Sequence, residues 1–237
     1  MAQPPDRRSP ASGVPAGAVD AFLQQVERTP AVATAGPRGR LIFALDATMS
    51  RQATWDLAQS LQGRMFETAA RLGGLDVQLV YFRGLAECRA SRFVADGAGL
   101  AALMSRIACQ GGHTQIGRVL KHALGETREK RVGALVFVGD AMEENPDDLA
   151  ALAGELGLLG VKAFLFQEGA DPGVTAVFKE LARLTGGAFA RFDAAAPQRL
   201  ADLLAAAAAY AVGGRTALER HAAGGGEAAR LLLTQMR

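Results

Sequence analysis

The chain has 237 residues, which is enough for one large domain with a sizeable hydrophobic core, alone or with tails. Its 26 basic and 24 acidic side chains give a formal charge of +2, so no strong field favours nucleic acid or an anionic membrane as a partner. Two cysteines, Cys88 and Cys109, are too few for a disulfide framework, and their spacing matches no zinc signature. The first residues lack a secretory signal and no apolar run is long enough to span a bilayer, so we expect a cytoplasmic protein with reduced thiols.

Residues 1–39 are predicted to form a proline-rich segment, because six of the nine prolines fall before residue 40. Within this segment, apolar residues recur at helical spacing between Gly17 and Glu27. We therefore expect one amphipathic helix there, which docks on the following domain or on a partner.

From residue 40 to residue 212 the chain alternates apolar runs with longer helical stretches, the pattern of a parallel sheet covered on both faces. A more polar run follows Arg83 and Gly84 and predicts a short antiparallel edge strand over Ala86–Phe93. The five apolar runs predicted as buried strands are Leu41–Leu45, Val77–Phe82, Ala134–Val138, Val161–Phe166 and Ala188–Phe192.

Helical periodicity between these strands completes an α/β domain over residues 40–212, a doubly wound and mostly parallel sheet flanked by helices. The first predicted helix ends at Gly73 and Gly74, which are typical of a C-terminal cap. Residues 213–237 form a tail that folds back as a broken helix or serves a partner, and the pattern leaves both open. The predicted helices are Thr54–Leu72, Ile116–Leu124, Asp147–Leu156, Val174–Leu184 and Pro197–Val212.

Three segments that are far apart in the sequence place oxygen-bearing side chains at the ends of predicted strands or in a glycine-rich turn. Asp46, Thr48 and Ser50 follow the first strand at alternate positions, Thr114 follows Gly111-Gly112-His113, and Asp140 closes the strand that ends at Gly139. Neighbouring parallel strands bring their carboxyl ends to one edge of the sheet, where open α/β sheets bind ligands. The segments therefore predict a single site for a hard divalent cation.

This arrangement resembles the metal-ion-dependent adhesion site (MIDAS) of the von Willebrand factor A (VWA) domain family over roughly residues 40–212. The matching positions are Asp46, Thr48, Ser50, Thr114 and Asp140. Two residues in these segments differ from those most common in the family. Thr48 stands where the family most often has serine, and Ala141 stands where many members have glycine.

The resemblance implies a Rossmann-like fold and a bound Mg²⁺ or Mn²⁺, with Asp46 or Asp140 reaching the ion directly or through water. Heavy use of alanine and glycine suggests a bacterial gene, so we expect a bacterial intracellular member of the family. It also implies a non-enzymatic interaction module, in which a partner protein supplies a carboxylate to an open coordination position. Intracellular relatives often belong to larger assemblies, and some act beside AAA+ ATPases, so such a complex is an expected partner.

Two other functions are compatible with these residues. An aspartate after a first strand also begins metal-dependent hydrolases and phosphotransferases of the haloacid dehalogenase type, with Asp46 as nucleophile. Those enzymes need a second carboxylate two positions later, and Thr48 cannot replace it as a proton donor. The third alternative is a structural scaffold with an empty metal site. Among nearby residues, we interpret His113, Glu143 and Glu144 as parts of solvated loops.

Overall fold

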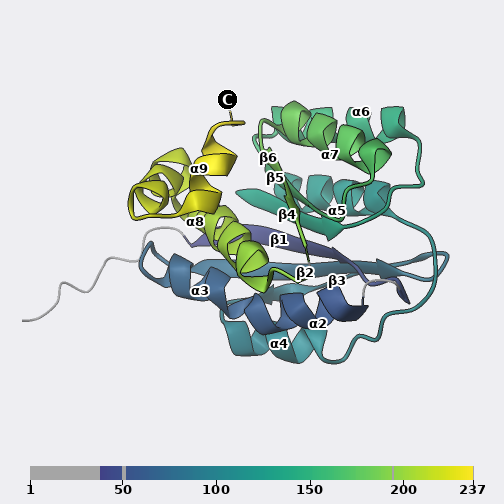
Figure 1. Ribbon diagram of the computed structural model, residues 1–237, viewed down its shortest axis with the longest axis horizontal. Coiled ribbons are helices and arrows are strands. Elements are labelled where there is room, and N and C mark those ends of the chain that lie inside the picture. The colour runs from purple at the N-terminus through teal and green to yellow at the C-terminus, as the bar shows by residue number, and fades with distance from the viewer. Residues whose placement is uncertain (1–37, 50–51, 194, 237) are drawn as a thin grey trace, which may run out of the picture. The chain divides into compact units, whose positions relative to one another are not determined.

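A computed structural model describes residues 38–49, 52–193 and 195–236, and the helix expected between Gly17 and Glu27 lies outside these ranges. The described chain contains a six-stranded sheet with the order β3-β2-β1-β4-β5-β6 (Figure 1). All pairings are parallel except that of β3, which lies antiparallel to β2 at one edge. The strands are β1 (Gly39–Asp46), β2 (Leu75–Arg83), β3 (Glu87–Val94), β4 (Ala134–Gly139), β5 (Lys162–Glu168) and β6 (Ala188–Phe192).

The strand order reverses at β1, which pairs with β2 on one side and with β4 on the other. Leu45 lies opposite Val138 in the β1–β4 ladder, so the chain leaves both strands at the same edge. Gly139 lies so close to Asp46 that a Cβ atom added there would be 3.9 Å from the Cβ of Asp46. This edge is the topological switch point, where doubly wound sheets form a ligand crevice.

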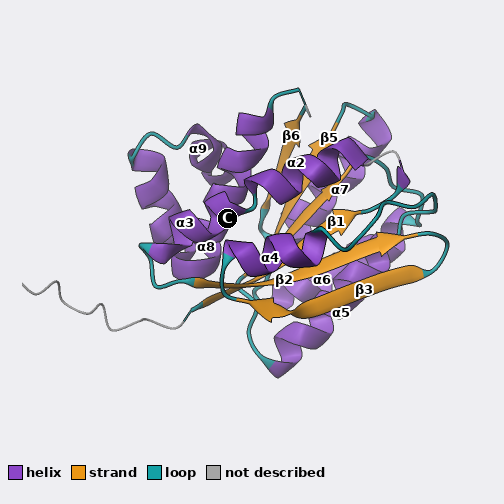
Figure 2. Ribbon diagram, turned by 90° about the horizontal axis from the view of Figure 1, so that it is seen from below, coloured by secondary structure: helices purple, strands orange, loops and turns teal. Residues whose placement is uncertain are grey.

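Helices cover both faces of the sheet, as Figure 2 shows from below. Alternate residues of β1 enter opposite cores, with Leu41 and Phe43 on one side and Ile42 and Ala44 on the other, because successive strand side chains point to opposite faces. One core contains side chains of α2 (Gln52–Leu61), α3 (Gly63–Ala70), α4 (Gly97–Met104), α8 (Pro197–Ala223) and α9 (Glu227–Leu233), and the other contains those of α5 (Ile116–Glu129), α6 (Pro146–Leu158) and α7 (Pro172–Thr185). None of the helices described is long and apolar enough to cross a membrane.

The predicted helix Thr54–Leu72 is two helices, α2 and α3, which meet at Gln62. The side chain of Gln62 donates a hydrogen bond to the carbonyl oxygen of Gly97 at 2.9 Å, which ties this junction to the start of α4. Helix α3 ends at Ala70, with Arg71 as its C-cap, which is two residues before the predicted end at Leu72. Gly73 and Gly74 follow in the turn to β2 with positive φ angles, 122° and 93°. Helix α4 was not predicted from the sequence.

The chain after Gly214 folds back against the sheet. Helix α8 is kinked at Gly213 and Gly214, and α9 packs beside its final turns (Figure 1). The side chain of Gln235 then forms two hydrogen bonds with the backbone of Phe189 in the edge strand β6. Its Oε1 accepts from the Phe189 N–H at 3.0 Å, and its Nε2 donates to the Phe189 carbonyl at 2.9 Å.

Candidate functional site

Four of the five predicted metal ligands line one open hollow of about 280 Å³ at the carboxyl edge of the sheet. We call this hollow the site pocket. The fifth predicted ligand, Ser50, lies outside the described residues. The residues that line the site pocket come from the end of β1 and the loop after it, from the loop after β4 and from the segment before α5: Asp46, Thr48, Met49, Gly111, Gly112, Thr114, Asp140, Ala141 and Glu143.

The end of β1 fixes the first two candidate ligands. The backbone N–H of Ala47 donates to the carbonyl oxygen of Phe82 at 2.9 Å, which extends the pairing with β2 by one residue. The chain then turns, and Oδ1 of Asp46 accepts a hydrogen bond from the N–H of Thr48 at 2.8 Å. Both side chains are largely buried, with 3% and 8% of their surfaces exposed. The turn therefore holds a carboxylate and a hydroxyl at the wall of the pocket.

The segment from Gln110 to His113 runs between two strand ends. The N–H of Gln110 donates to the carbonyl of Ala47 at 3.0 Å, and the N–H of His113 donates to the carbonyl of Gly84 at 3.2 Å. Gly112 packs so tightly on the turn after β2 that an added Cβ atom would lie 2.0 Å from the oxygen of Gly84. The glycine at this position thus permits the contact that places the next residues at the site.

Thr114 and Glu143 bind each other reciprocally across the site pocket. The hydroxyl oxygen of Thr114 accepts from the N–H of Glu143 at 2.9 Å, and the Glu143 carboxylate accepts from the N–H of Thr114 at 3.1 Å. The same carboxylate oxygen lies 2.9 Å from Nδ1 of His113. The backbone hydrogen bond from Thr114, followed by the interaction with His113, lowers the pKa of Glu143.

Glu144 binds the first turn of α5. Its two carboxylate oxygens accept hydrogen bonds from the backbone N–H groups of Ile116 at 2.6 Å and Gly117 at 2.8 Å. These groups have no partner within the helix, and a negative charge near them is favourable because of the helix dipole. Glu143 and Glu144 lie in a loop, and Glu143 is exposed, as expected, but their hydrogen bonds to backbone groups were not predicted. Although partly exposed, they join the loop after β4 to the segment that carries Thr114.

No local pattern identifies these contacts. Glu143 and Glu144 bind backbone groups that lie 27 to 29 positions earlier in the chain. The available signal was an acidic pair soon after a strand-end aspartate, which is compatible with many surface loops. His113 is exposed, as expected, but its ring contacts Glu143.

The donor set of the site pocket suits a hard divalent cation. Asp46 and Asp140 supply two carboxylates, and Thr48 and Thr114 supply neutral hydroxyls. Mg²⁺ and Mn²⁺ prefer such oxygen ligands, and Mg²⁺ usually keeps several waters. Among the described residues, no three His, Cys, Asp or Glu side chains form a metal-binding group. A cation here would therefore depend on the hydroxyls as well as on the acids.

Comparison with known proteins establishes the fold. No protein-family model matches the chain, and no curated protein matches its sequence. Among solved structures, the VWA domain of SpRpn10 is 10% identical with a TM-score of 0.54, covering 69% of this chain and 95% of that one. An aerotolerance-related membrane protein from Bacteroides fragilis, with multiple mutations to serines, is 19% identical with a TM-score of 0.52, covering 68% and 95%.

The human COPII-coat protein Sec24c is 13% identical with a TM-score of 0.56, covering 72% of this chain and 32% of that one. The expected α/β class is therefore confirmed, and the described chain has the Rossmann-like VWA fold.

Proposed function

We propose that this chain is a divalent-metal-dependent protein interaction module that captures an acidic residue of a partner through a MIDAS-type site. The observation that carries the proposal is the convergence of Asp46, Thr48, Thr114 and Asp140 on one open pocket at the switch point of the sheet. Ser50, which follows Thr48 at the alternate position, is the proposed fifth ligand. The VWA fold supports the proposal, because these ligand positions are the ones at which the sequence resembles the MIDAS of that family.

The charge of the site explains why a partner carboxylate is the proposed ligand. The carboxylates of Asp46 and Asp140 balance a dication, while the hydroxyl ligands add no further negative charge. The third carboxylate that lines the pocket, Glu143, is bound by His113 and by the N–H of Thr114. A bound Mg²⁺ or Mn²⁺ would supply an electrophilic centre at which an external carboxylate completes the coordination. In this arrangement the side chains of the protein hold and orient the ion, and the partner provides the remaining ligand.

A binding role fits the site better than hydrolysis. A phosphotransferase that uses Asp46 as nucleophile needs a nearby acid at the position of Thr48, and a threonine does not donate protons efficiently at neutral pH. We therefore propose a non-enzymatic module of the bacterial cytosol, with a larger assembly such as an AAA+ ATPase complex as a candidate partner. The alternative is a structural scaffold with an empty site, which a metal titration would distinguish from the proposed module because the scaffold binds no ion.

The test is a calorimetric titration of the full chain with Mg²⁺ and Mn²⁺. The variant Asp46→Asn removes a charge but retains an oxygen acceptor for the N–H of Thr48, so its turn should survive. The control Asp148→Asn removes a charge from the exposed first turn of α6. Stoichiometric binding by wild type and by the control, but not by Asp46→Asn, is the expected result. Equal binding by all three proteins, or by none, contradicts the proposal.

A further inference from the structure

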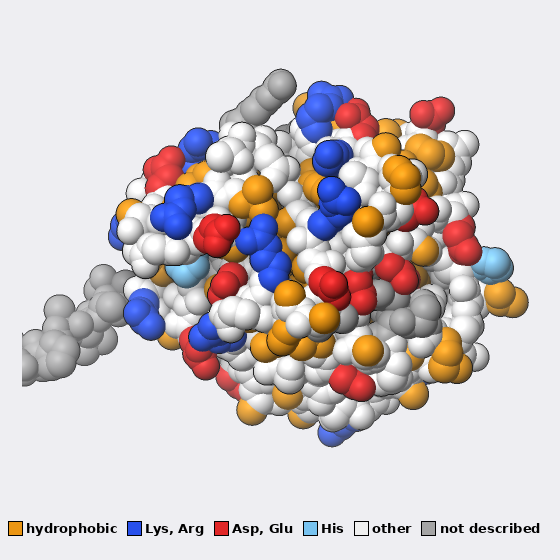
Figure 3. Space-filling view, in the orientation of Figure 1, with side chains coloured by type: hydrophobic (Ala, Val, Ile, Leu, Met, Phe, Trp, Pro, Cys, Tyr) orange, Lys and Arg blue, Asp and Glu red, His pale blue; other side chains and the backbone are white. Residues whose placement is uncertain are grey.

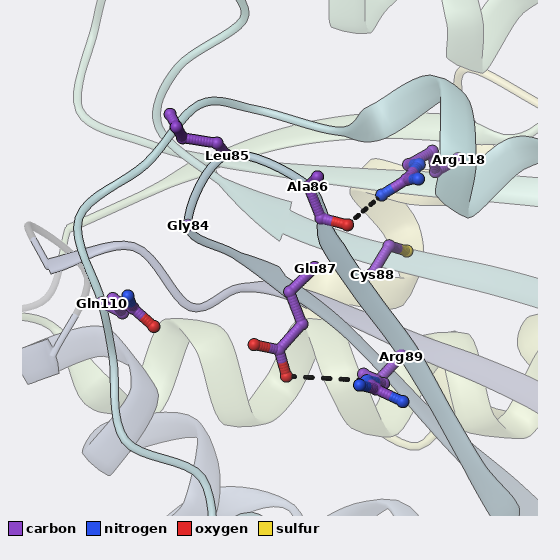
Figure 4. A pocket seen from close by; sticks show the side chains of 8 residues that line it. All are labelled: Gly84, Leu85, Ala86, Glu87, Cys88, Arg89, Gln110 and Arg118. Atoms are coloured by element: carbon purple, nitrogen blue, oxygen red, sulfur yellow. Dashed lines mark hydrogen bonds and ion pairs between the residues drawn. The ribbon is translucent and has the colours of Figure 1, made fainter.

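A second hollow of about 410 Å³ lies beside the turn between β2 and β3, and we call it the turn pocket. Figure 4 shows Gln110 on one side of this turn and Arg118, from α5, on the other. Arg118 reaches across to the carbonyl oxygen of Ala86 and holds the turn against the helix. The lining residues are Gly84, Leu85, Ala86, Glu87, Cys88, Arg89, Gln110 and Arg118.

The turn pocket and the site pocket adjoin each other. Gln110 lines the turn pocket, and the next two residues, Gly111 and Gly112, line the site pocket. The contact of Gly112 with Gly84 fixes the turn beside this shared segment. An extended ligand bound in the site pocket therefore needs only to cross the segment 110–112 to enter the turn pocket.

Two cationic side chains, Arg89 and Arg118, line the turn pocket, and they differ in their partners. The carboxylate of Glu87 is already matched by Arg83 at 3.0 Å and by Arg89 at 3.7 Å. Arg118, in contrast, has no carboxylate within ion-pair distance in the described part of the chain. Its Nη1 donates to Ala86 and to Oε1 of Gln115, which leaves the N–H groups of Nε and Nη2 for an external acceptor.

Two large apolar side chains flank these hollows and are unusually exposed. Met49, which lines the site pocket, is 64% exposed, and Leu85, which lines the turn pocket, is 77% exposed. Hydrophobic side chains also protrude at the right-hand edge of the molecule in Figure 3, on the side where β1 and β4 end. Apolar groups beside convergent polar groups are typical of a surface that binds another protein.

We propose that the partner segment carries a second acidic side chain, which enters the turn pocket and pairs with Arg118 while an apolar neighbour contacts Leu85 or Met49. This inference rests on the proposed function, because the first carboxylate binds at the metal site. The guanidinium group offers a planar set of donors that matches a carboxylate, so the second contact adds specificity as well as affinity. The partner class is thus an acidic segment with an interspersed apolar residue.

The test selects binders from a library of random twelve-residue peptides displayed on phage, with Mg²⁺ present and with elution by chelator. The targets are wild type, Arg118→Gln, Arg118→Lys, Asp46→Asn and the control Arg131→Gln. Arg131 is also exposed, and it precedes β4 at the opposite edge of the sheet. Wild type and the control should enrich peptides with two acidic residues, whereas Arg118→Gln should enrich peptides with one.

Synthetic versions of an enriched peptide then separate the two contacts. Loss of the second acid should weaken binding to wild type about tenfold and leave binding to Arg118→Gln unchanged, as expected for a charge-assisted pair. Arg118→Lys should recover part of the preference for peptides with a second acidic residue. Thermal melts check that each variant folds. Mg²⁺-dependent peptides that bind wild type and Arg118→Gln equally well overturn this inference alone. Failure to enrich any Mg²⁺-dependent peptide on wild type overturns both this inference and the proposed function.

Discussion

Thr114 and Glu143 exchange two hydrogen bonds, one from each backbone N–H to the other residue's side chain. The pair joins the segment before α5 to the loop after β4, which are the segments that carry Thr114 and Asp140. Neither segment can shift far without breaking one of these bonds. The relative position of these two candidate ligands is therefore set by a residue outside the predicted ligand set.

Replacement of Glu143 should weaken metal binding without removing a ligand. We expect Glu143→Ala to lower Mg²⁺ affinity by about tenfold, because partners that orient metal ligands typically contribute on that scale. Calorimetric titration measures the change. The control Glu129→Ala removes an exposed carboxylate at the other end of α5 and should bind like wild type. Unchanged affinity in Glu143→Ala would show that Thr114 is held in place without this pair.

Adding one methyl group at Gly112 should disrupt the site, whereas the same change at Gly111 should not. A Cβ atom at Gly112 meets the oxygen of Gly84 at 2.0 Å, while a Cβ atom at Gly111 has open space around it. We expect Gly112→Ala to destabilise the fold by about 1–3 kcal/mol, as overpacking commonly does, and to weaken metal binding. Urea unfolding and metal titration of the two variants provide a matched comparison, and similar behaviour of both would contradict the prediction.

Glu144 should contribute more to stability than an ordinary surface glutamate. Its carboxylate binds two N–H groups at the start of α5, so Glu144→Ala should lower the free energy of unfolding by about 1–2 kcal/mol. Glu155→Ala, which removes only the exposed ion pair with Arg128, should change it by less than about 1 kcal/mol. Chemical denaturation of both variants measures the two losses in the free energy of unfolding. A larger loss in Glu155→Ala than in Glu144→Ala would contradict the prediction.

His122 should make stability depend on pH. Its Nε2 lies 2.9 Å from Oε1 of Gln78, and burial lowers its pKa, partly opposed by Glu126. The unfolded chain takes up this proton near the ordinary value of about 6.5, before the folded protein does. Because the unfolded state then binds more protons, the free energy of unfolding should decrease as pH falls below about 6.5 and down to the lowered pKa.

The variant His122→Gln is the control for measuring this pH dependence of stability. Glutamine keeps a hydrogen-bond donor for Gln78 but does not titrate in this range. Urea unfolding of both proteins between pH 5 and pH 8 should therefore show a steeper pH dependence for wild type, by an amount that reflects this one group. Identical pH profiles would contradict the expected lowering of the pKa.

The sheet was predictable because its strands are buried on both faces. Continuous apolar runs such as Ala134–Val138 leave little ambiguity. Four of the five lie within a strand of the structure, and the fifth, Val161–Phe166, begins one residue before β5. The meeting of Asp46 and Asp140 at one edge followed from parallel pairing of their strands. Sequence reasoning therefore located four candidate ligands in one pocket, although their binding of a metal ion remains a prediction.

The elements that were missed depend on contacts between distant parts of the chain. Helix α4 is short, contains two glycines and has an apolar sequence without a polar face, so periodicity does not reveal it. Its N-cap, Asp96, accepts from the N–H of Gly99, while Gln62 binds Gly97 from the α2–α3 junction. Likewise, Glu143 and Glu144 find backbone partners nearly thirty positions earlier, which a reading of local pattern cannot foresee.

The contact between Gln235 and Phe189 covers part of the exposed edge of the sheet at β6. The amide of Gln235 satisfies one donor and one acceptor on the outer side of β6, just as a neighbouring strand would. Unpaired strand edges invite pairing with other chains. Gln235 thus covers part of this strand edge, and we expect its replacement by alanine to favour self-association through β6.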